Sequence, residues 1–197
     1  MQNRQWPAVW TVRIGSLSID LPLAGGADGF KIYAFDSMGQ TLWNKEAARA
    51  FARLLDKTSF DIILTAESKS IALAEELATA LEHPRYVVLR KSQKLYMTNP
   101  IALKVKSITT ACTQTFYLGS EQQELLRGKR VLVLDDVVST GGTMDTIFEM
   151  AQAIGFTVAC VACVLSEDIR RTEYNGVPLV TLDHIPLPGF QESMPET

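Results

Sequence analysis

The segment 131–143 constrains the fold of this chain more than any other. Four apolar residues run directly into two adjacent carboxylates, Asp135 and Asp136. A short polar turn with paired glycines follows, and a helical pattern begins at Thr143. A strand that passes through such a turn into a helix can hold a phosphate on backbone N–H groups, while acidic side chains bind hydroxyls or a metal ion. The segment therefore predicts a phosphate-binding junction between a strand and a helix.

Strand and helix patterns alternate from Asn44 onward, and Asn44 itself is the expected N-cap of the first helix. The predicted helices are 44–55, 71–81 and the segment from 143, and the predicted strands are 60–65, 86–89, 131–134, 156–165 and 177–182. This alternation predicts an α/β fold with a mostly parallel central sheet flanked by helices. Right-handed crossovers place the carboxyl ends of the strands, and with them the ligand, at one edge of the sheet.

The length of 197 residues, 47% of them hydrophobic, fits one sizeable domain spanning 1–197. Residues 1–35 are β-rich and are expected to join this domain. A polar run, 109–115, separates two plausible strands within 98–128. This connection is either a mobile lid or an ordinary β-hairpin excursion, and both readings fit the sequence.

Charge and hydropathy exclude several classes of partner. The net charge of -3 gives no electrostatic reason to expect nucleic acid. No apolar run approaches the roughly 18 residues that a membrane span needs. The first seven residues lack the apolar core of a secretory signal. We therefore expect a cytoplasmic protein without a nucleic-acid or membrane partner.

The cysteines and histidines do not predict a zinc site. Cys160 and Cys163 form a C-x-x-C pair, but they lie in an apolar run that is predicted to be a buried strand. Residues three apart on a strand point to opposite faces, so core packing is favoured over a shared metal. His83 and His184 have no local partner at metal-ligand spacing.

The turn that follows the two acids suits a phosphate. It offers several N–H groups, hydroxyls and two residues without a Cβ, directly before a helix N-terminus. Its residues are Ser139, Thr140, Gly141, Gly142 and Thr143. The Walker and dinucleotide-binding glycine motifs are absent. A polar turn that binds nothing is the alternative, and the combination of two acids with this turn disfavours it.

The same segment resembles the signature of the type I phosphoribosyltransferases, which bind phosphoribosyl pyrophosphate (PRPP). The resemblance covers roughly 30–185 and implies the type I fold with a small hood from the terminal segments, 1–40 among them. It implies that the turn binds the 5′-phosphate and that the catalytic acids Asp135 and Asp136 take the ribose hydroxyls or hold Mg²⁺ through water. It also makes 104–120 a flexible loop that closes over PRPP.

Two further loops match the pyrophosphate end of this family. The first, 65–70, follows a predicted strand, and the corresponding family loop often contains a strained non-proline peptide bond. It would present Ser68, Lys69 and Ser70 to pyrophosphate, although Ser70 stands where adenine and xanthine enzymes have glycine. The alternative makes Glu67 and Ser68 only the N-cap region of the next helix.

The second loop, 90–94, resembles the Arg-Lys-x-x-Lys segment found near the pyrophosphate in these enzymes. On this reading Arg90 and Lys94 bind pyrophosphate, whose departure needs positive charge. A basic surface turn is the alternative.

The acceptor implied by the resemblance is a purine base. No lysine occurs after Lys129, which argues against a hypoxanthine-guanine enzyme, where a lysine after the next strand recognises the purine oxygen. The layout resembles adenine phosphoribosyltransferase most, with the xanthine enzyme second and a non-catalytic, PRPP-sensing regulator of purine genes as another alternative. Phe30 or Phe35 could stack on the base, although core packing is favoured for both. A homodimer is expected.

Overall fold

The computed structural model describes residues 5–26, 29–55, 58–105, 114–139, 141–167 and 171–189. Thr140 and most of the polar run 109–115 lie outside these ranges. No helix in the described ranges is both long and apolar enough to cross a membrane.

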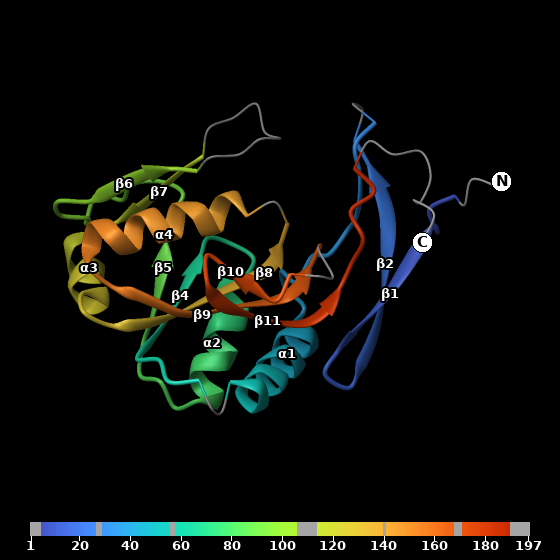
Figure 1. Cartoon of the computed structure of the whole chain (residues 1–197), viewed down its shortest axis with the longest axis horizontal. Helices are drawn as coiled ribbons and strands as arrows, with labels where there is room; N and C mark the ends of the chain where they lie inside the picture. Colours follow the sequence, from blue (N-terminus) through green and yellow to red (C-terminus); the bar gives the residue numbers. More distant parts are fainter. Residues whose placement is uncertain are drawn as a thin grey trace.

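A six-stranded sheet forms the centre of the molecule, with the strand order β10-β11-β9-β8-β4-β5 (Figure 1). Every neighbouring pair in it is parallel except β10 with β11. Its strands are β4 (Ile62–Ala66), β5 (Tyr86–Leu89), β8 (Arg130–Val138), β9 (Thr157–Ser166), β10 (Glu173–Tyr174) and β11 (Val177–His184). The predicted α/β fold with a mostly parallel sheet is confirmed.

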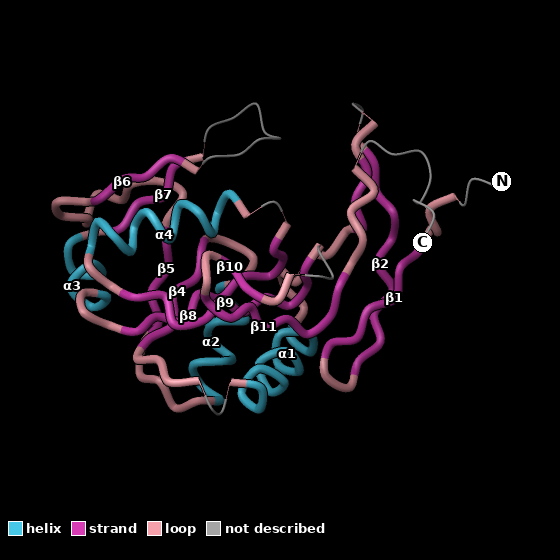
Figure 2. Tube along the Cα trace, viewed as in Figure 1, coloured by secondary structure: helices cyan, strands magenta, loops and turns pink. Residues whose placement is uncertain are grey.

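Four helices flank this sheet in the described residues: α1 (Thr41–Leu54), α2 (Ile71–Ala80), α3 (Ser120–Leu126) and α4 (Gly142–Ile154). Helices α1 and α2 lie on one face and α4 on the other (Figure 2). Each face has its own apolar core, because successive side chains of a strand point to opposite sides. Cys160 belongs to the core under α1 and α2 and Cys163 to the core under α4, as their spacing predicts.

The predicted N-cap at Asn44 is wrong. Helix α1 begins at Thr41 and its N-cap is Gln40. Asn44 lies inside the first turn and is buried, and its amide Nδ2 donates to the carbonyl oxygen of Ser37 at 3.0 Å. The side chain therefore satisfies a carbonyl of the preceding loop and ties that loop to the helix.

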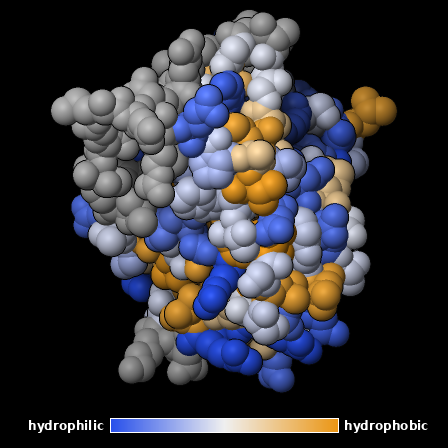
Figure 3. Space-filling view, turned by 90° about the vertical axis from the view of Figure 1, so that its right-hand side faces the viewer, coloured by the Kyte–Doolittle hydropathy of each residue, from blue (hydrophilic) through white to orange (hydrophobic). Residues whose placement is uncertain are grey.

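A separate antiparallel sheet stands beside the central one and forms the hood (Figure 1). Its strands are β1 (Val9–Ile14), β2 (Leu17–Gly25) and β3 (Lys31–Tyr33). Lys31 also pairs with Gly189, so segments from both ends of the chain build the hood. Buried side chains of the hood, such as Val12 and Ile14, pack into the core under α1 and α2. On the hood face the apolar side chains form separate patches among hydrophilic ones (Figure 3).

Strands β6 (Ile101–Lys104) and β7 (Thr115–Leu118) form an antiparallel hairpin. The N–H of Val105 donates to the carbonyl oxygen of Gln114 at 2.7 Å and extends this pairing toward the segment 106–113, which lies outside the described residues. The two plausible strands of the sequence are therefore real. Closure of this connection as a lid stays a prediction.

The strand order places a switch point between β4 and β8. The chain runs from β4 to β5 on one side and then returns to place β8 on the other side of β4. In open α/β sheets, ligands bind at the carboxyl ends of the strands at such a point. Strand β8 continues to Val138, so Asp135 and Asp136 lie within its last part. The sequence had predicted that both acids follow the strand.

Candidate active site

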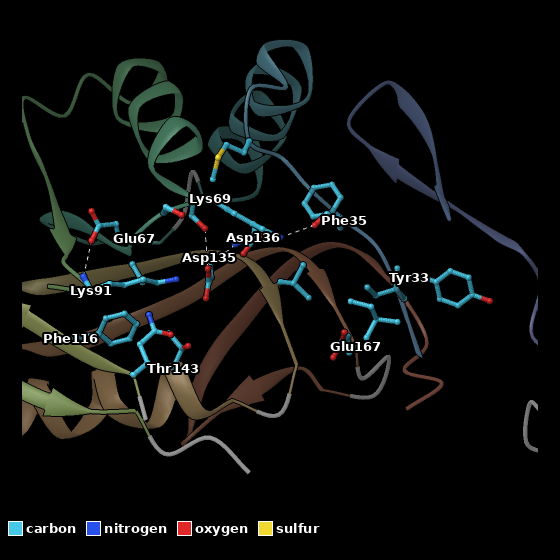
Figure 4. A pocket seen from close by; sticks show the side chains of 18 residues that line it. Tyr33, Phe35, Glu67, Lys69, Lys91, Phe116, Asp135, Asp136, Thr143 and Glu167 are labelled. Atoms are coloured by element: carbon cyan, nitrogen blue, oxygen red, sulfur yellow. Dashed lines mark hydrogen bonds and ion pairs between the residues drawn. The ribbon is translucent and has the colours of Figure 1, made fainter. Parts of the chain in front are cut away.

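A cavity of about 390 Å³ opens at this switch point. It runs from Glu67, Lys91 and Thr143 at one end, past Asp135 and Asp136, to the hood (Figure 4). Its volume is within the range of small-molecule sites. The two acids, the loop after β4 and the start of α4 thus line one cavity, as the sequence predicted.

Asp135 forms the hydrogen-bonded centre of the cavity. Its Oδ1 accepts from the Ser70 hydroxyl at 2.9 Å and from the N–H of Asp136 at 2.9 Å. Burial, and then the neighbouring carboxylate of Asp136, raise the pKa of Asp135 to about 7, although the Ser70 hydrogen bond opposes the rise. Two adjacent carboxylates in such a place favour a bound proton or a cation between them.

The loop after β4 is held by charge and by the backbone. The peptide bond between Glu67 and Ser68 is cis, which matches the non-proline feature expected from the resemblance. The Glu67 carboxylate forms an ion pair with Arg90 at 3.1 Å and accepts from the N–H of Lys91 at 2.7 Å. The N-cap of α2 is Ser70, whose hydroxyl bonds Asp135 instead of a backbone N–H. Capping alone therefore does not account for this loop.

Lys69 spans the cavity toward the hood. Its Nζ donates to the carbonyl oxygen of Phe35 at 3.1 Å and lies 3.8 Å from Oδ2 of Asp136. Its side chain is 44% exposed, so the ammonium group can reorient toward a ligand with little packing to lose. Ser68 and Ser70 line the same cavity.

The basic residues of 90–94 do not all line the cavity. Lys91 lines the cavity. It belongs to the predicted Arg-Lys-x-x-Lys segment, in which Arg90 and Lys94 were the residues assigned to pyrophosphate. Arg90 pairs with Glu67 and lines a second hollow on the other side of this loop. Lys94 donates from Nζ to the Ser92 hydroxyl at 2.7 Å and is not among the cavity residues. The alternation of side chains after β5, which buries Leu89, was the available signal for Lys91.

The turn before α4 is braced from the far edge of the sheet. Gly141 has a left-handed backbone with φ 95° and is the N-cap of α4, while Gly142 is its first residue. The Tyr174 hydroxyl lies 2.9 Å from the carbonyl oxygen of Gly141. Arg171 donates from Nη1 to the carbonyl oxygen of Ser139 at 3.2 Å. Thr143 lines the cavity, so the N-terminus of α4 faces it.

The hood end of the cavity contains a residue that sequence reasoning missed. Glu167 follows β9 and lines the cavity. Its position directly after a parallel strand was the available signal, because it places Glu167 at the same sheet edge as Asp135. Phe35 is 5% exposed and stacks on Trp43 with ring centroids 5.8 Å apart, so it packs in the core as favoured, and it also lines the cavity. Phe30 is not among the cavity residues.

Among the described residues that line the cavity, Asp135 and Asp136 are the adjacent carboxylates that could hold a divalent cation. The described residues contain no group of three or more histidines, cysteines or carboxylates that could hold a metal. Mg²⁺ keeps several waters and is usually held by one or two carboxylates together with substrate phosphates. Asp135 and Asp136 fit that mode of binding.

The fold and this cavity define a class of protein: an α/β protein with a small-molecule cavity at the switch point of its mostly parallel sheet. Residues 40–185 match the model of the phosphoribosyl transferase domain. The chain therefore belongs to the phosphoribosyltransferase family. This match confirms the predicted type I phosphoribosyltransferase family, and the relatives place the chain among the purine members of that family.

The similar curated proteins include two substrate classes and a regulator. A hypoxanthine/guanine phosphoribosyltransferase from Methanospirillum hungatei is 29% identical over 62% of this chain and 63% of its own length. An adenine phosphoribosyltransferase from Leuconostoc citreum is 31% identical over 74% of this chain and 82% of its length. The purine biosynthesis transcriptional repressor PurR of Bacillus subtilis is 24% identical over 71% of this chain and 48% of its length.

Solved structures show the same fold. The adenine phosphoribosyltransferase of Thermoanaerobacter pseudethanolicus superposes with a TM-score of 0.66 at 18% identity, over 84% of this chain and 95% of that one. The Trypanosoma brucei enzyme, in complex with AMP, pyrophosphate and ribose-5-phosphate, gives 0.61 at 23% identity, over 82% and 75%.

Proposed function

We propose that this protein transfers the 5-phosphoribosyl group of PRPP to a purine, with adenine favoured, and releases pyrophosphate. The observation that carries the proposal is the hydrogen bond between Ser70 and Asp135, at 2.9 Å. It joins the loop assigned to pyrophosphate to the acid assigned to ribose across the switch point. One substrate that carries both groups would span this contact.

Each part of the cavity has a role in this proposal. The turn 139–143 binds the 5′-phosphate on backbone N–H groups at the start of α4. Asp135 and Asp136 orient the ribose hydroxyls and would hold a Mg²⁺ ion through water. Such an ion would neutralise negative charge on the pyrophosphate. Lys69 and Lys91 lie where they can attract the departing pyrophosphate.

The preference for adenine has support from the chain itself. No lysine occurs after Lys129, so this part of the chain supplies no ammonium group to bind the oxygen of a 6-oxopurine. A carboxylate, Glu167, lies at the hood end of the cavity instead. The similarity to both adenine and hypoxanthine/guanine enzymes leaves the base to be decided by experiment.

Turnover with each base tests the proposal. The purified protein is incubated with PRPP, Mg²⁺ and adenine, hypoxanthine, guanine or xanthine in turn, and pyrophosphate release is measured. Release with adenine is the expected result. Release with xanthine alone would show that the alternative acceptor, xanthine, is the substrate. PRPP binding without turnover of any base would refute the proposal that the protein is an enzyme.

The acid pair provides a second test. We expect Asp135→Asn combined with Asp136→Asn to weaken PRPP binding by about 100-fold or more, because neutral amides accept more weakly from the ribose hydroxyls and provide no charge for a cation. Asp20→Asn, an exposed change on β2, is the matched control. Calorimetry measures the affinity and circular dichroism checks the fold. Unchanged PRPP affinity would refute the assigned role.

A PRPP-sensing regulator is the second candidate, favoured by the similarity to the B. subtilis repressor over 71% of this chain. The same turnover assay separates it from the enzyme. The homodimer and the cytoplasmic location stay predictions, and light scattering of the purified protein tests the first.

A further inference from the structure

Glu167 lines the same cavity as Asp135 and Asp136 but lies at its hood end (Figure 4). Strand β9 is parallel to β8, and Val138 pairs with Ser166, so Glu167 comes at the same sheet edge as the acid pair. Its N–H donates to the carbonyl oxygen of Val138 at 3.0 Å, which anchors its backbone. Figure 4 shows its side chain at the hood end, away from Glu67 and Lys91.

The carboxylate of Glu167 is incompletely satisfied. The Ser139 hydroxyl donates to it, but Oε2 is buried and has no hydrogen-bond partner among the residues that the structure describes. Burial raises the pKa of this group. A buried acceptor without a partner is costly, so such an atom indicates a place for a donor from a ligand.

The surroundings of Glu167 suit a flat heteroaromatic ring. Ile32 of the hood, Val137 of β8 and Ile185 line the cavity at this end. The N–H of Ile185 donates to the carbonyl oxygen of Ser166 at 3.0 Å, which holds the apolar side chain next to the acid. An apolar end with one polar group is the usual design of a site that fixes both the plane and the edge of a ligand.

We infer that Glu167 is a specificity-determining residue that accepts a hydrogen bond from the 6-amino group of the purine. This inference rests on the proposed function. An amino group offers an N–H to the carboxylate, whereas the carbonyl oxygen of a 6-oxopurine would place its lone pairs against those of Oε2. A site built to satisfy a hydrogen bond discriminates strongly against an analogue that leaves the buried group unpaired.

The test compares two substrates in one variant. Glu167→Gln presents either an amide oxygen or an amide N–H, so it can satisfy an amino group or a carbonyl oxygen. We expect the ratio of kcat/KM for adenine to that for hypoxanthine to fall about tenfold or more, with the change in KM for the base. The KM for PRPP should stay within about twofold, because glutamine keeps a side-chain oxygen that can accept from the Ser139 hydroxyl of the phosphate turn.

Glu173→Gln is the matched control, since Glu173 is an exposed acid on β10 and is not among the cavity residues. It should leave the ratio unchanged. Should Glu167→Gln fail to fold, Glu167→Asp retains the charge on a shorter side chain. Glu167→Asp should then raise the KM for adenine while keeping adenine preferred over hypoxanthine.

The outcomes separate the two proposals. Wild-type protein that turns over no purine refutes the proposed function. Wild-type turnover of adenine, with a base ratio that Glu167→Gln leaves unchanged, overturns the role of Glu167 alone. A wild-type preference for guanine over adenine also overturns it, because the 6-amino group would then not be the group recognised.

Discussion

The phenolic oxygen of Tyr174 lies 2.9 Å from the carbonyl oxygen of Gly141 and 2.9 Å from Oδ1 of Asp145. Tyr174 is on β10, at the edge of the central sheet, and Gly141 is the N-cap of α4. Arg171 lies over the Tyr174 ring at 5.3 Å and also bonds the carbonyl oxygen of Ser139. The antiparallel pair of β10 and β11, here called the edge hairpin, therefore supports the turn that we assign to the 5′-phosphate.

Removal of the Tyr174 hydroxyl should weaken this support. We expect Tyr174→Phe to lower the free energy of unfolding by about 1–2 kcal/mol and to raise the dissociation constant for PRPP, because the buried carbonyl oxygen of Gly141 and the Asp145 carboxylate lose the one hydroxyl that they share. Urea denaturation and calorimetry measure the two effects. Tyr96→Phe, at a side chain that is 69% exposed, is the control. Equal losses in both variants would contradict the bracing role.

Gly141 should tolerate a side chain far less than other left-handed glycines. A Cβ at Gly141 would overlap the Tyr174 hydroxyl, whereas a Cβ at Gly155 meets nothing within 4 Å. Both have positive φ, 95° and 86°. Gly155→Ala should therefore cost about 1–2 kcal/mol of stability, the cost of the backbone alone, and Gly141→Ala clearly more. Similar unfolding midpoints for the two variants would refute the steric argument.

The raised pKa of Asp135 should give the metal-free protein a characteristic pH dependence. Burial moves this pKa from 3.8 to about 7, so between these values the folded state binds more protons than the unfolded state. The free energy of unfolding should therefore fall as pH rises from about 4 to about 7. Urea denaturation in EDTA at several pH values measures it.

Asp135→Asn should flatten this dependence, because the amide does not titrate. Asp20→Asn, at an exposed carboxyl, should keep the wild-type profile. An Asp135→Asn profile that still falls as in the wild type would show that another group is responsible.

Three lysines should differ in their effect on PRPP use. Lys69 and Lys91 line the cavity, whereas Lys94 bonds Ser92 and is not among the cavity residues. We expect Lys69→Ala and Lys91→Ala each to lower kcat/KM for PRPP by about 10-fold or more, since each removes positive charge near the leaving group. Lys94→Ala should change it by less than about twofold. Steady-state kinetics at saturating purine measures these values. A larger loss of kcat/KM in Lys94→Ala than in Lys69→Ala and Lys91→Ala would support the assignment of Lys94 to pyrophosphate that the sequence predicted.

The thiols of β9 should be unreactive in the native protein. Burial raises the pKa of Cys160 to about 11 and that of Cys163 to about 12. Because the thiolate is the reactive form, iodoacetamide should label neither at pH 8. Cys112 lies outside the described residues, so the experiment uses Cys112→Ser. Intact mass should show no adduct natively and two in guanidinium, and native labelling would contradict the buried placement.

The sequence predicted correctly those features that depend on residues close together in the chain. The hydrophobic runs predicted the strands, and the order of two acids, a polar turn and a helix predicted the phosphate junction. Boundaries were less accurate. Asn44 was taken as a cap because its residue type favours caps, but tertiary burial placed it inside α1, where it bonds the carbonyl of Ser37. Strand β8 extends past Asp135 because its pairing with β9 continues to Val138.

The sequence by itself determined the junction of strand, acid pair, turn and helix, because Asp135, Asp136 and the paired glycines are contiguous and their chemistry is local. Only the tertiary structure decided which distant residues join them. Ser70 reaches Asp135 because β4 and β8 are paired, and Glu167 enters the cavity because β9 ends beside β8. Tyr174 meets Gly141 because the edge hairpin folds back over α4. These contacts depend on strand order and register, which no short stretch of sequence encodes.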